Sequence, residues 1–207
     1  MTTFDWIAAA VVIISIIYIS FALTVADWLV ALRKGQAVSL LPERTGRKWP
    51  LWAQIALMVV GLLICIPLFY YGWVPLFKIA DSTKIILKVV GLFVYLAGLG
   101  FTLWARRTLG KYWGLSTSID VKLLDEHQLI QSGPYAFVRH PMYFGWWVAM
   151  LGLTLLYPVW ALFILFASSL ISFFGRAQRE EAALAERFGD SWVEYKHRTW
   201  FIIPLIY

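Results

Sequence analysis

Long apolar runs, each followed by a short polar stretch, dominate the pattern along this chain. A helix that spans a bilayer needs about 20 apolar residues, within a range of about 17 to 25. Residues 4–32, 51–77 and 85–105 meet this requirement, and Pro67 inside the second run predicts a kink. Two shorter apolar runs follow at residues 141–157 and 158–175. The pattern therefore predicts about five membrane helices.

The last two runs predict a tight helical hairpin that turns at Tyr157 and Pro158 and crosses the membrane thinly or at a tilt. Pro141 and Pro158 stand at the starts of these runs. We expect each of them in the first turn of its helix, where the missing N–H of proline would have no partner in any case.

The tail from Arg176 onwards mixes five basic with five acidic residues, and its pattern is amphipathic. Gly189 predicts the end of a first tail helix. Residues 191–194, Ser-Trp-Val-Glu, resemble a capping box that would begin a second short helix. The closing apolar residues 200–205 are too few to span a bilayer, so we expect them to return to the interface or to pack on the bundle.

Composition supports the same class of protein. Of the 207 residues, 61% are hydrophobic and 14% are charged, which is too apolar for an ordinary soluble domain. We predict an all-α, polytopic membrane protein with a single domain, in which residues 1–105 form three spans and residues 106–207 form a loop, the hairpin and the tail. The single Cys65 excludes an internal disulfide, and the three histidines lack metal-ligand spacing, so we expect no metal.

The basic residues predict the orientation. Fifteen of the 18 lie in segments 32–50, 106–140 and 176–198, which five spans would place on one side of the membrane. The positive-inside rule makes that side cytoplasmic, so the N-terminus is expected outside and the C-terminus in the cytoplasm. The charges lack the base-reading or stacking pattern of a nucleic-acid interface, so the lipid bilayer, and no nucleic acid, is the expected partner.

Residues 133–145 place a Gly-Pro-Tyr turn, an arginine and a histidine directly before an apolar helix. A helix that begins at Pro141 presents backbone N–H groups and a positive dipole end, and Arg139 and His140 add donors. This pattern predicts a site for a carboxylate or phosphate at the cytoplasmic face. The alternative is that Arg139 reaches lipid headgroups and that the tyrosines of the segment belong to an aromatic belt.

Two further patterns each allow two interpretations. Arg176 and Glu180 are four residues apart, so they share a helix face. They form either an ordinary surface ion pair or a pair at the mouth of the pocket, where a guanidinium can bind a carboxylate. Asp27 is either a site residue or an interfacial partner of a nearby basic residue. Glycines at 91, 98 and 100 are expected to permit close helix contact.

Several short motifs, taken in this order, resemble the isoprenylcysteine carboxyl methyltransferase family and its wider phospholipid methyltransferase relatives. They cover about residues 105–207 and comprise Leu109-Gly110-Lys111-Tyr112-Trp113, His127-Gln128-Leu129-Ile130, Gly133-Pro134-Tyr135, Arg139-His140-Pro141-Met142-Tyr143, Glu180-Glu181, Phe188-Gly189, Tyr195, Arg198 and Ile203-Pro204.

The resemblance implies an integral membrane methyltransferase that uses S-adenosyl-L-methionine. It implies that a cofactor pocket forms from the last spans, the preceding loop and the tail, and that Arg176 contacts the acceptor and Glu180 acts beside it in catalysis. The cofactor-binding residues that it implies are His127, Gln128, Leu129, Ile130, Tyr135, His140, Pro141, Met142, Tyr143 and Glu180.

The implied reaction is direct methyl transfer to a lipophilic acceptor, most naturally carboxyl O-methylation of a prenylcysteine-like molecule. An acceptor carboxylate is already ionised at neutral pH, whereas an amine needs a base, for which His140 or Glu180 would serve. Three alternatives remain open: a phospholipid N-methyltransferase, an NADPH-dependent sterol-type reductase and a non-catalytic membrane protein. The reductases typically show Asn before the tyrosine of the equivalent motif, where this chain has Met142.

Overall fold

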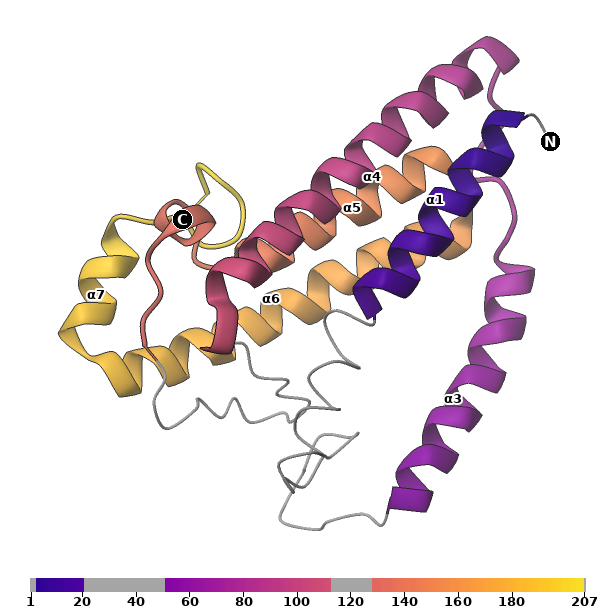
Figure 1. The fold of residues 1–207 in the computed structure, drawn as a ribbon. Helices are drawn as coiled ribbons and strands as arrows, with labels where there is room; N and C mark the ends of the chain where they lie inside the picture. Colours follow the sequence, from indigo (N-terminus) through magenta and orange to yellow (C-terminus); the bar gives the residue numbers. More distant parts are fainter. Residues whose placement is uncertain (1–2, 21–50, 113–127, 207) are drawn as a thin grey trace. The chain divides into compact units, whose positions relative to one another are not determined.

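The computed structural model describes residues 3–20, 51–112 and 128–206 (Figure 1). Within these ranges the chain forms helices and no β-strand, which confirms the all-α class. Asp27 and His127 lie outside the described residues. The helices are α1 (Thr3–Ser20), α3 (Leu51–Tyr71), α4 (Asp81–Leu109), η2 (Gly110–Tyr112), η3 (Gly133–Ala136), α5 (Pro141–Leu156), α6 (Trp160–Phe188) and α7 (Asp190–His197).

Two compact units divide the chain. One comprises Met1–Ile55 with Leu115–Ile119, and the other comprises Ala56–Gly114 with Asp120–Tyr207. In the first unit, α1 accounts for the apolar run from residue 4 as far as Ser20. The second unit contains α4 to α7, and with them the candidate site and the pocket described below.

Helix α3 contains Pro67, as predicted, but it ends at Tyr71, six residues before the end of its apolar run. The backbone after it pairs with the turn between α5 and α6 instead of continuing the helix. Leu76 N–H donates to the carbonyl of Pro158 at 2.9 Å, and Trp160 N–H donates to the carbonyl of Val74 at 3.0 Å. These hydrogen bonds replace the helical ones that a longer α3 would make.

Helices α4 and α5 lie side by side at very close range (Figure 1). A Cβ atom added at Gly91 would lie 2.5 Å from Leu156 N, and one added at Gly98 would lie 2.3 Å from Ala149 N. Only glycine allows two backbones to approach this closely, so the predicted role is confirmed for these two positions. It is wrong for Gly100, whose added Cβ has no atom of the described residues within 4 Å.

The predicted hairpin of α5 and α6 is present, and its turn lies at residues 157–159. Pro141 is the first residue of α5, as expected. Pro158, however, precedes α6, so its placement in the first helical turn is wrong. Val159 is extended and forms an isolated bridge with Pro75, which delays the start of the helix to Trp160.

Helix α6 runs without interruption from its apolar half into the charged residues of the tail and ends at Phe188. Gly189 ends it with φ of +49°, a conformation that favours glycine, as the sequence predicted. The predicted capping box at residues 191–194 is wrong. The carbonyl of Gly189 accepts hydrogen bonds from the N–H groups of Trp192 and Val193, so α7 begins at Asp190 and Ser191 lies inside its first turn.

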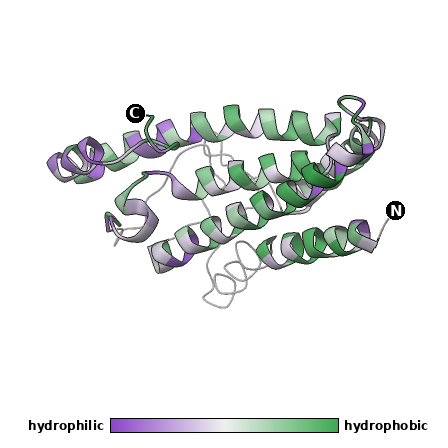
Figure 2. Cartoon of the chain, turned by 90° about the horizontal axis from the view of Figure 1, so that it is seen from above, coloured by the Kyte–Doolittle hydropathy of each residue, from purple (hydrophilic) through white to green (hydrophobic). Residues whose placement is uncertain are grey.

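Among the described residues, α4 and α6 are long and apolar enough to cross a bilayer, while α1, α5 and Val59–Tyr71 form shorter apolar helices. Figure 2 shows hydrophobic colour along most of the helices and hydrophilic colour towards their ends. Length and composition thus identify two candidate spans where the apolar runs predict about five.

The C-terminal segment packs on the start of α5, which is one of the two placements expected for it. Val138 and Trp200 form an isolated parallel bridge, and His140 N–H donates to the carbonyl of Phe201 at 3.1 Å. Directly after Phe201, Ile202 belongs to a buried cluster with Trp147 of α5 and Ala177 of α6. This core fixes three parts of the chain that lie far apart in the sequence.

Candidate active site

The polar residues singled out by the sequence converge where α5 begins, where α6 leaves its apolar half and where the C-terminal segment returns. The first part supplies Arg139, His140 and Tyr143, and α6 supplies Arg176, Glu180 and Glu181. The contacts below join all six side chains into one hydrogen-bonded and ion-paired cluster, which we call the EE cluster after its two glutamates.

Glu180 forms one half of the EE cluster. Its Oε1 accepts a hydrogen bond from the hydroxyl of Tyr143 at 2.5 Å and another from Nε of Arg176 at 3.0 Å. The Arg176 side chain keeps 33% of its surface exposed, whereas that of Glu180 keeps 23%. The helical spacing therefore does bring the predicted pair together, and a second helix supplies a third member.

His140 lies between the two glutamates. Its Nδ1 is 3.4 Å from Oε2 of Glu180, and its Nε2 is 3.6 Å from Oε1 of Glu181. The ring is 5% exposed, and neither distance is short enough for a strong hydrogen bond; Nε2 has no hydrogen-bond partner among the described residues. A charged imidazolium is the form that two flanking carboxylates stabilise.

Two opposed effects set the pKa of His140. Burial lowers it because a buried ring loses the hydration of its charged form, and this is the largest single effect. Glu180 and Glu181 together outweigh burial, so the pKa lies above its ordinary value of 6.5. The two glutamates therefore favour the charged form of His140 more than water would, and this form has no free nitrogen to accept a proton.

Arg139 points into the protein, and its side chain is only 3% exposed. Its Nε donates to Oε1 of Glu181 at 2.5 Å, and NH1 donates to the carbonyls of Lys196 at 3.2 Å and Thr199. The guanidinium also lies 5.5 Å from the ring centroid of Phe201. In this arrangement Arg139 joins α6 to the C-terminal segment.

The segment around η3 is fastened to α7 by a buried hydrogen bond. The hydroxyl of Tyr195 donates to the backbone carbonyl of Tyr135 at 2.8 Å. Burial raises the pKa of both phenols, and the negative charge of Glu180 contributes to the rise at Tyr135. Tyr135 is therefore buried and lies within electrostatic reach of the EE cluster.

Aromatic rings enclose the EE cluster. The Tyr143 ring stacks on His140 with centroids 5.6 Å apart and on Phe173 of α6 with centroids 4.9 Å apart. The Phe201 ring lies nearly perpendicular to the His140 ring, with centroids 5.3 Å apart. Aromatic faces attract cations, and they also limit the rotation of the imidazole ring.

The structure brings together four of the predicted site residues, namely His140, Tyr143, Arg176 and Glu180. Pro141 and Met142 occupy the first turn of α5 beside them, and Tyr135 lies buried in η3. Gln128 is exposed, and Leu129 and Ile130 are half-buried in the segment before η3. Within the described ranges, none of these last three makes a polar contact with the EE cluster, and their roles stay predictions.

Two members of the EE cluster had no place among the predicted site residues. Glu181 was visible only as the neighbour of Glu180, and sequence spacing cannot show that the two face different partners. Arg139 was expected to offer donors to an anion, but its bonds are to Glu181 and to two backbone carbonyls of the tail. In the sequence, only the position of Arg139 and Glu181 inside these motifs indicates that they matter, and it does not identify their partners.

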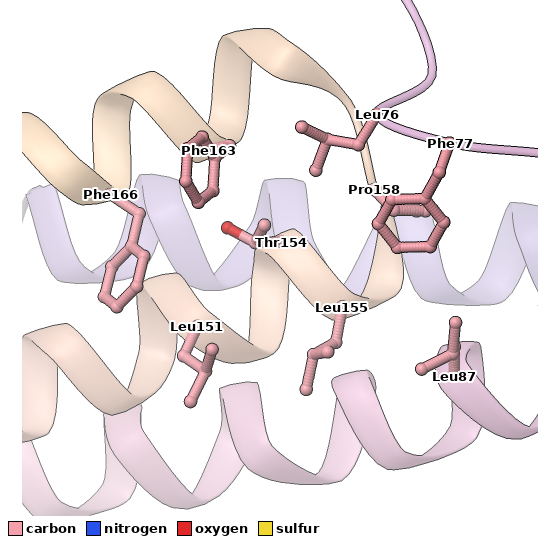
Figure 3. A pocket seen from close by; sticks show the side chains of 9 residues that line it. All are labelled: Leu76, Phe77, Leu87, Leu151, Thr154, Leu155, Pro158, Phe163 and Phe166. Atoms are coloured by element: carbon pink, nitrogen blue, oxygen red, sulfur yellow. The ribbon is translucent and has the colours of Figure 1, made fainter.

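An apolar pocket lies elsewhere in the same unit, where α4, α5 and α6 meet the segment after α3. Its volume is about 290 Å³, and Figure 3 shows its lining of Leu76, Phe77, Leu87, Leu151, Thr154, Leu155, Pro158, Phe163 and Phe166. The hydroxyl of Thr154 already donates to the carbonyl of Met150 at 2.8 Å. The pocket therefore offers no group for proton or ion chemistry, unlike the EE cluster.

Comparison with known proteins confirms the resemblance drawn from the motifs. The model of the isoprenylcysteine carboxyl methyltransferase (ICMT) family matches residues 89–186, just under half of the chain. That range includes η3, α5 and all six residues of the EE cluster.

Curated relatives carry the name protein-S-isoprenylcysteine O-methyltransferase. The protein of Schizosaccharomyces pombe is 40% identical over 82 residues, which are 39% of this chain and 35% of that protein. The protein of Saccharomyces cerevisiae is 30% identical over 141 residues, 67% of this chain and 57% of that protein. The human protein is 36% identical over 85 residues, 40% and 29% of the two chains. The chain thus spans about a third to somewhat over half of the length of these relatives.

Proposed function

We propose that this chain is an S-adenosyl-L-methionine-dependent methyltransferase that methylates the carboxylate of a prenylcysteine-like acceptor. The observation that carries the proposal is the EE cluster. It joins the Arg-His-Pro and Glu-Glu motifs, which are 42 residues apart, through direct contacts between side chains. The relatives named isoprenylcysteine O-methyltransferases support the choice of acceptor.

The residues present suit such a donor. S-adenosylmethionine supplies an electrophilic methyl group on a positively charged sulfur and also carries a carboxylate. The Glu180 carboxylate and the stacked rings of Tyr143 and Phe173 suit a cation. The start of α5, with the unbonded Nε2 of buried His140 beside it, suits an anion. We propose that the predicted residues His127 to Ile130, Tyr135 and His140 to Tyr143 line this pocket.

Arg176 is the proposed contact for the acceptor because its guanidinium is partly exposed while Glu180 fixes it from the protein side. A terminal carboxylate is ionised at neutral pH, so the chain has to bind and orient it rather than deprotonate it. This favours a carboxylate over an amine acceptor, since Glu180 is engaged by Tyr143 and Arg176 and the two glutamates raise the pKa of His140, which favours its charged form, a form that cannot accept a proton.

We also propose that the chain crosses the membrane about five times, with the N-terminus outside and the EE cluster and tail on the cytoplasmic side. The two long apolar helices and the three shorter ones support the span count. The concentration of basic residues in segments 32–50, 106–140 and 176–198 supports the orientation. A lipophilic acceptor would then reach Arg176 from the bilayer.

The decisive experiment is transfer of labelled methyl from S-adenosylmethionine by the purified protein in detergent, with a farnesylated cysteine or phosphatidylethanolamine as acceptor. We expect an alkali-labile methyl ester on the first acceptor. Arg176→Ala and Glu180→Ala should each abolish it, whereas Arg179→Ala and Glu186→Ala, exposed positions on the same helix, should not.

Ligand binding separates the alternatives. S-adenosylhomocysteine should raise the melting temperature and NADPH should not, because a ligand stabilises only a state that binds it. Stabilisation by NADPH alone would indicate a reductase, and a labelled phosphatidylethanolamine would indicate N-methylation. Full ester formation by Arg176→Ala and Glu180→Ala would show that the reaction depends on other residues.

A further inference from the structure

The adjacent glutamates of the EE cluster face different surroundings. Glu180 contacts Tyr143 and Arg176, and Arg176 is one-third exposed, so this side is open to a ligand. Glu181 contacts Arg139, whose side chain is 3% exposed, and lies 3.4 Å from Nζ of Lys196 on α7. Glu180 therefore has a partner near the surface, Arg176, whereas Glu181 has a buried partner, Arg139.

His140 lies between the two glutamates and connects their surroundings. Its Nδ1 faces Glu180 and its Nε2 faces Glu181, at 3.4 and 3.6 Å. Among the described residues, the ionisable groups around the ring include these two carboxylates of α6 and the Tyr143 phenol of α5. Arg139 directly precedes it in the chain, Arg176 lies beyond Glu180, and Lys196 of α7 lies beyond Glu181. The Glu181 carboxylate is thus one of two charged groups that face the ring nitrogens, beside the aromatic contacts of Tyr143 and Phe201.

We propose that Glu181, itself held by Arg139, is a positioning residue that sets the orientation and charge of His140 and through it the affinity for the methyl donor. Glu181 touches neither donor nor acceptor in this proposal. The inference rests on the proposed function in one respect only, namely that His140 belongs to the cofactor pocket.

A purely structural role explains the arrangement less well. The C-terminal segment is already fastened without Glu181, through the bonds of Arg139 NH1 to the carbonyls of Lys196 and Thr199 and through the bridge between Val138 and Trp200. Buried ion pairs often contribute little net stability because desolvation opposes the attraction between the charges. What Glu181 adds is a fixed negative charge beside Nε2 of His140.

The test compares Glu181→Gln with Glu186→Gln, which makes the same chemical change at an exposed position of the same helix. The protein in detergent is labelled at its three histidines, and the His140 signal is assigned by its loss in His140→Asn. Titration by NMR gives the His140 pKa, and calorimetry gives the Kd of S-adenosylhomocysteine. Methyl transfer at saturating donor gives the KM for the acceptor.

We expect Glu181→Gln to lower the His140 pKa and to weaken S-adenosylhomocysteine by about tenfold, a typical cost of losing a group that orients a ligand-binding side chain. The KM for the acceptor should stay within about twofold, because Arg176 and Glu180 are untouched. Glu186→Gln should change none of the three values.

An unchanged His140 pKa and an unchanged Kd in Glu181→Gln would overturn the proposal. It would also be overturned if Glu181→Gln yielded less folded protein but the folded protein bound S-adenosylhomocysteine with the wild-type Kd. If Glu181→Gln does not fold, Glu181→Asp is judged by the same two values, since its carboxylate is withdrawn by one methylene. The titration needs no activity. A wild-type protein that fails to bind S-adenosylhomocysteine therefore refutes the proposed function, while the His140 pKa still tests its dependence on Glu181.

Discussion

Replacement of Gly98 by alanine tests the close packing of α4 on α5. The new Cβ would lie 2.3 Å from Ala149 N, 2.6 Å from the carbonyl oxygen of Gly145 and 2.8 Å from Ala149 Cα. An ordinary contact needs at least about 3.4 Å, so the shortfall is about 1 Å. All three neighbours are backbone atoms of α5 and cannot rotate aside, so the two helices have to separate.

Gly100→Ala supplies the control because it lies on the same helix and has open space around its added Cβ. Both substitutions gain the helix propensity of alanine over glycine, about 1 kcal/mol in water, so their difference isolates the clash. Overpacking of this kind costs about 1–3 kcal/mol. For a chain of this size, that corresponds to a melting temperature lower by about 2–12 °C in Gly98→Ala than in Gly100→Ala.

Tryptophan fluorescence during heating in detergent measures this difference, since the chain contains 12 tryptophans. Equal melting temperatures for the two variants would refute the reasoning, because they would show that α4 and α5 do not approach each other at Gly98 as described.

Three further predictions concern the surroundings of the EE cluster. Arg139→Gln should destabilise the protein by about 1–3 kcal/mol, because the part-buried carboxylate of Glu181 loses its shortest partner; a melting temperature equal to that of wild type would contradict this. Tyr195→Phe should lower the free energy of unfolding by about 1–3 kcal/mol, because the buried carbonyl of Tyr135 loses its donor. An unchanged melting temperature would show that water replaces the lost hydroxyl at this carbonyl. The raised pKa of His140 predicts a stabilisation that is complete below the unfolded pKa near 6.5 and is lost as pH rises through the folded pKa. Melting temperatures of wild type and His140→Asn should therefore converge with increasing pH, and a constant gap would count against a charged His140.

The sequence predicts the local parts of this structure well. The apolar hairpin, the start of α5 at Pro141 and the end of α6 at Gly189 follow from proline, glycine and the length of apolar runs. The contact between Arg176 and Glu180 follows from helical spacing alone. Each of these depends on residues that are near one another in the chain.

The remaining features depend on tertiary contacts. The α7 capping box was wrong because the Gly189 carbonyl, rather than Ser191, accepts the first N–H groups of the helix. Tyr143 contacts Glu180 across 37 residues of sequence, and Arg139 contacts Glu181 across 42. No local spacing in the sequence specifies which glutamate meets which partner. The motifs indicated which residues matter, and only the packing of α5, α6 and the tail shows which of them meet.

The uninterrupted course of α6 has a mechanical consequence. Glu180 stands 20 residues beyond the first residue of this helix, a distance of about 30 Å along its axis. A change in tilt of about 5° about that first residue would move Glu180 sideways by about 2.6 Å, enough to break its contacts with Tyr143 and His140. With the proposed placement in the membrane, a thinner or thicker bilayer that alters helix tilt would act on these contacts directly. The length of the lipid chains would then change the affinity of the protein for the methyl donor.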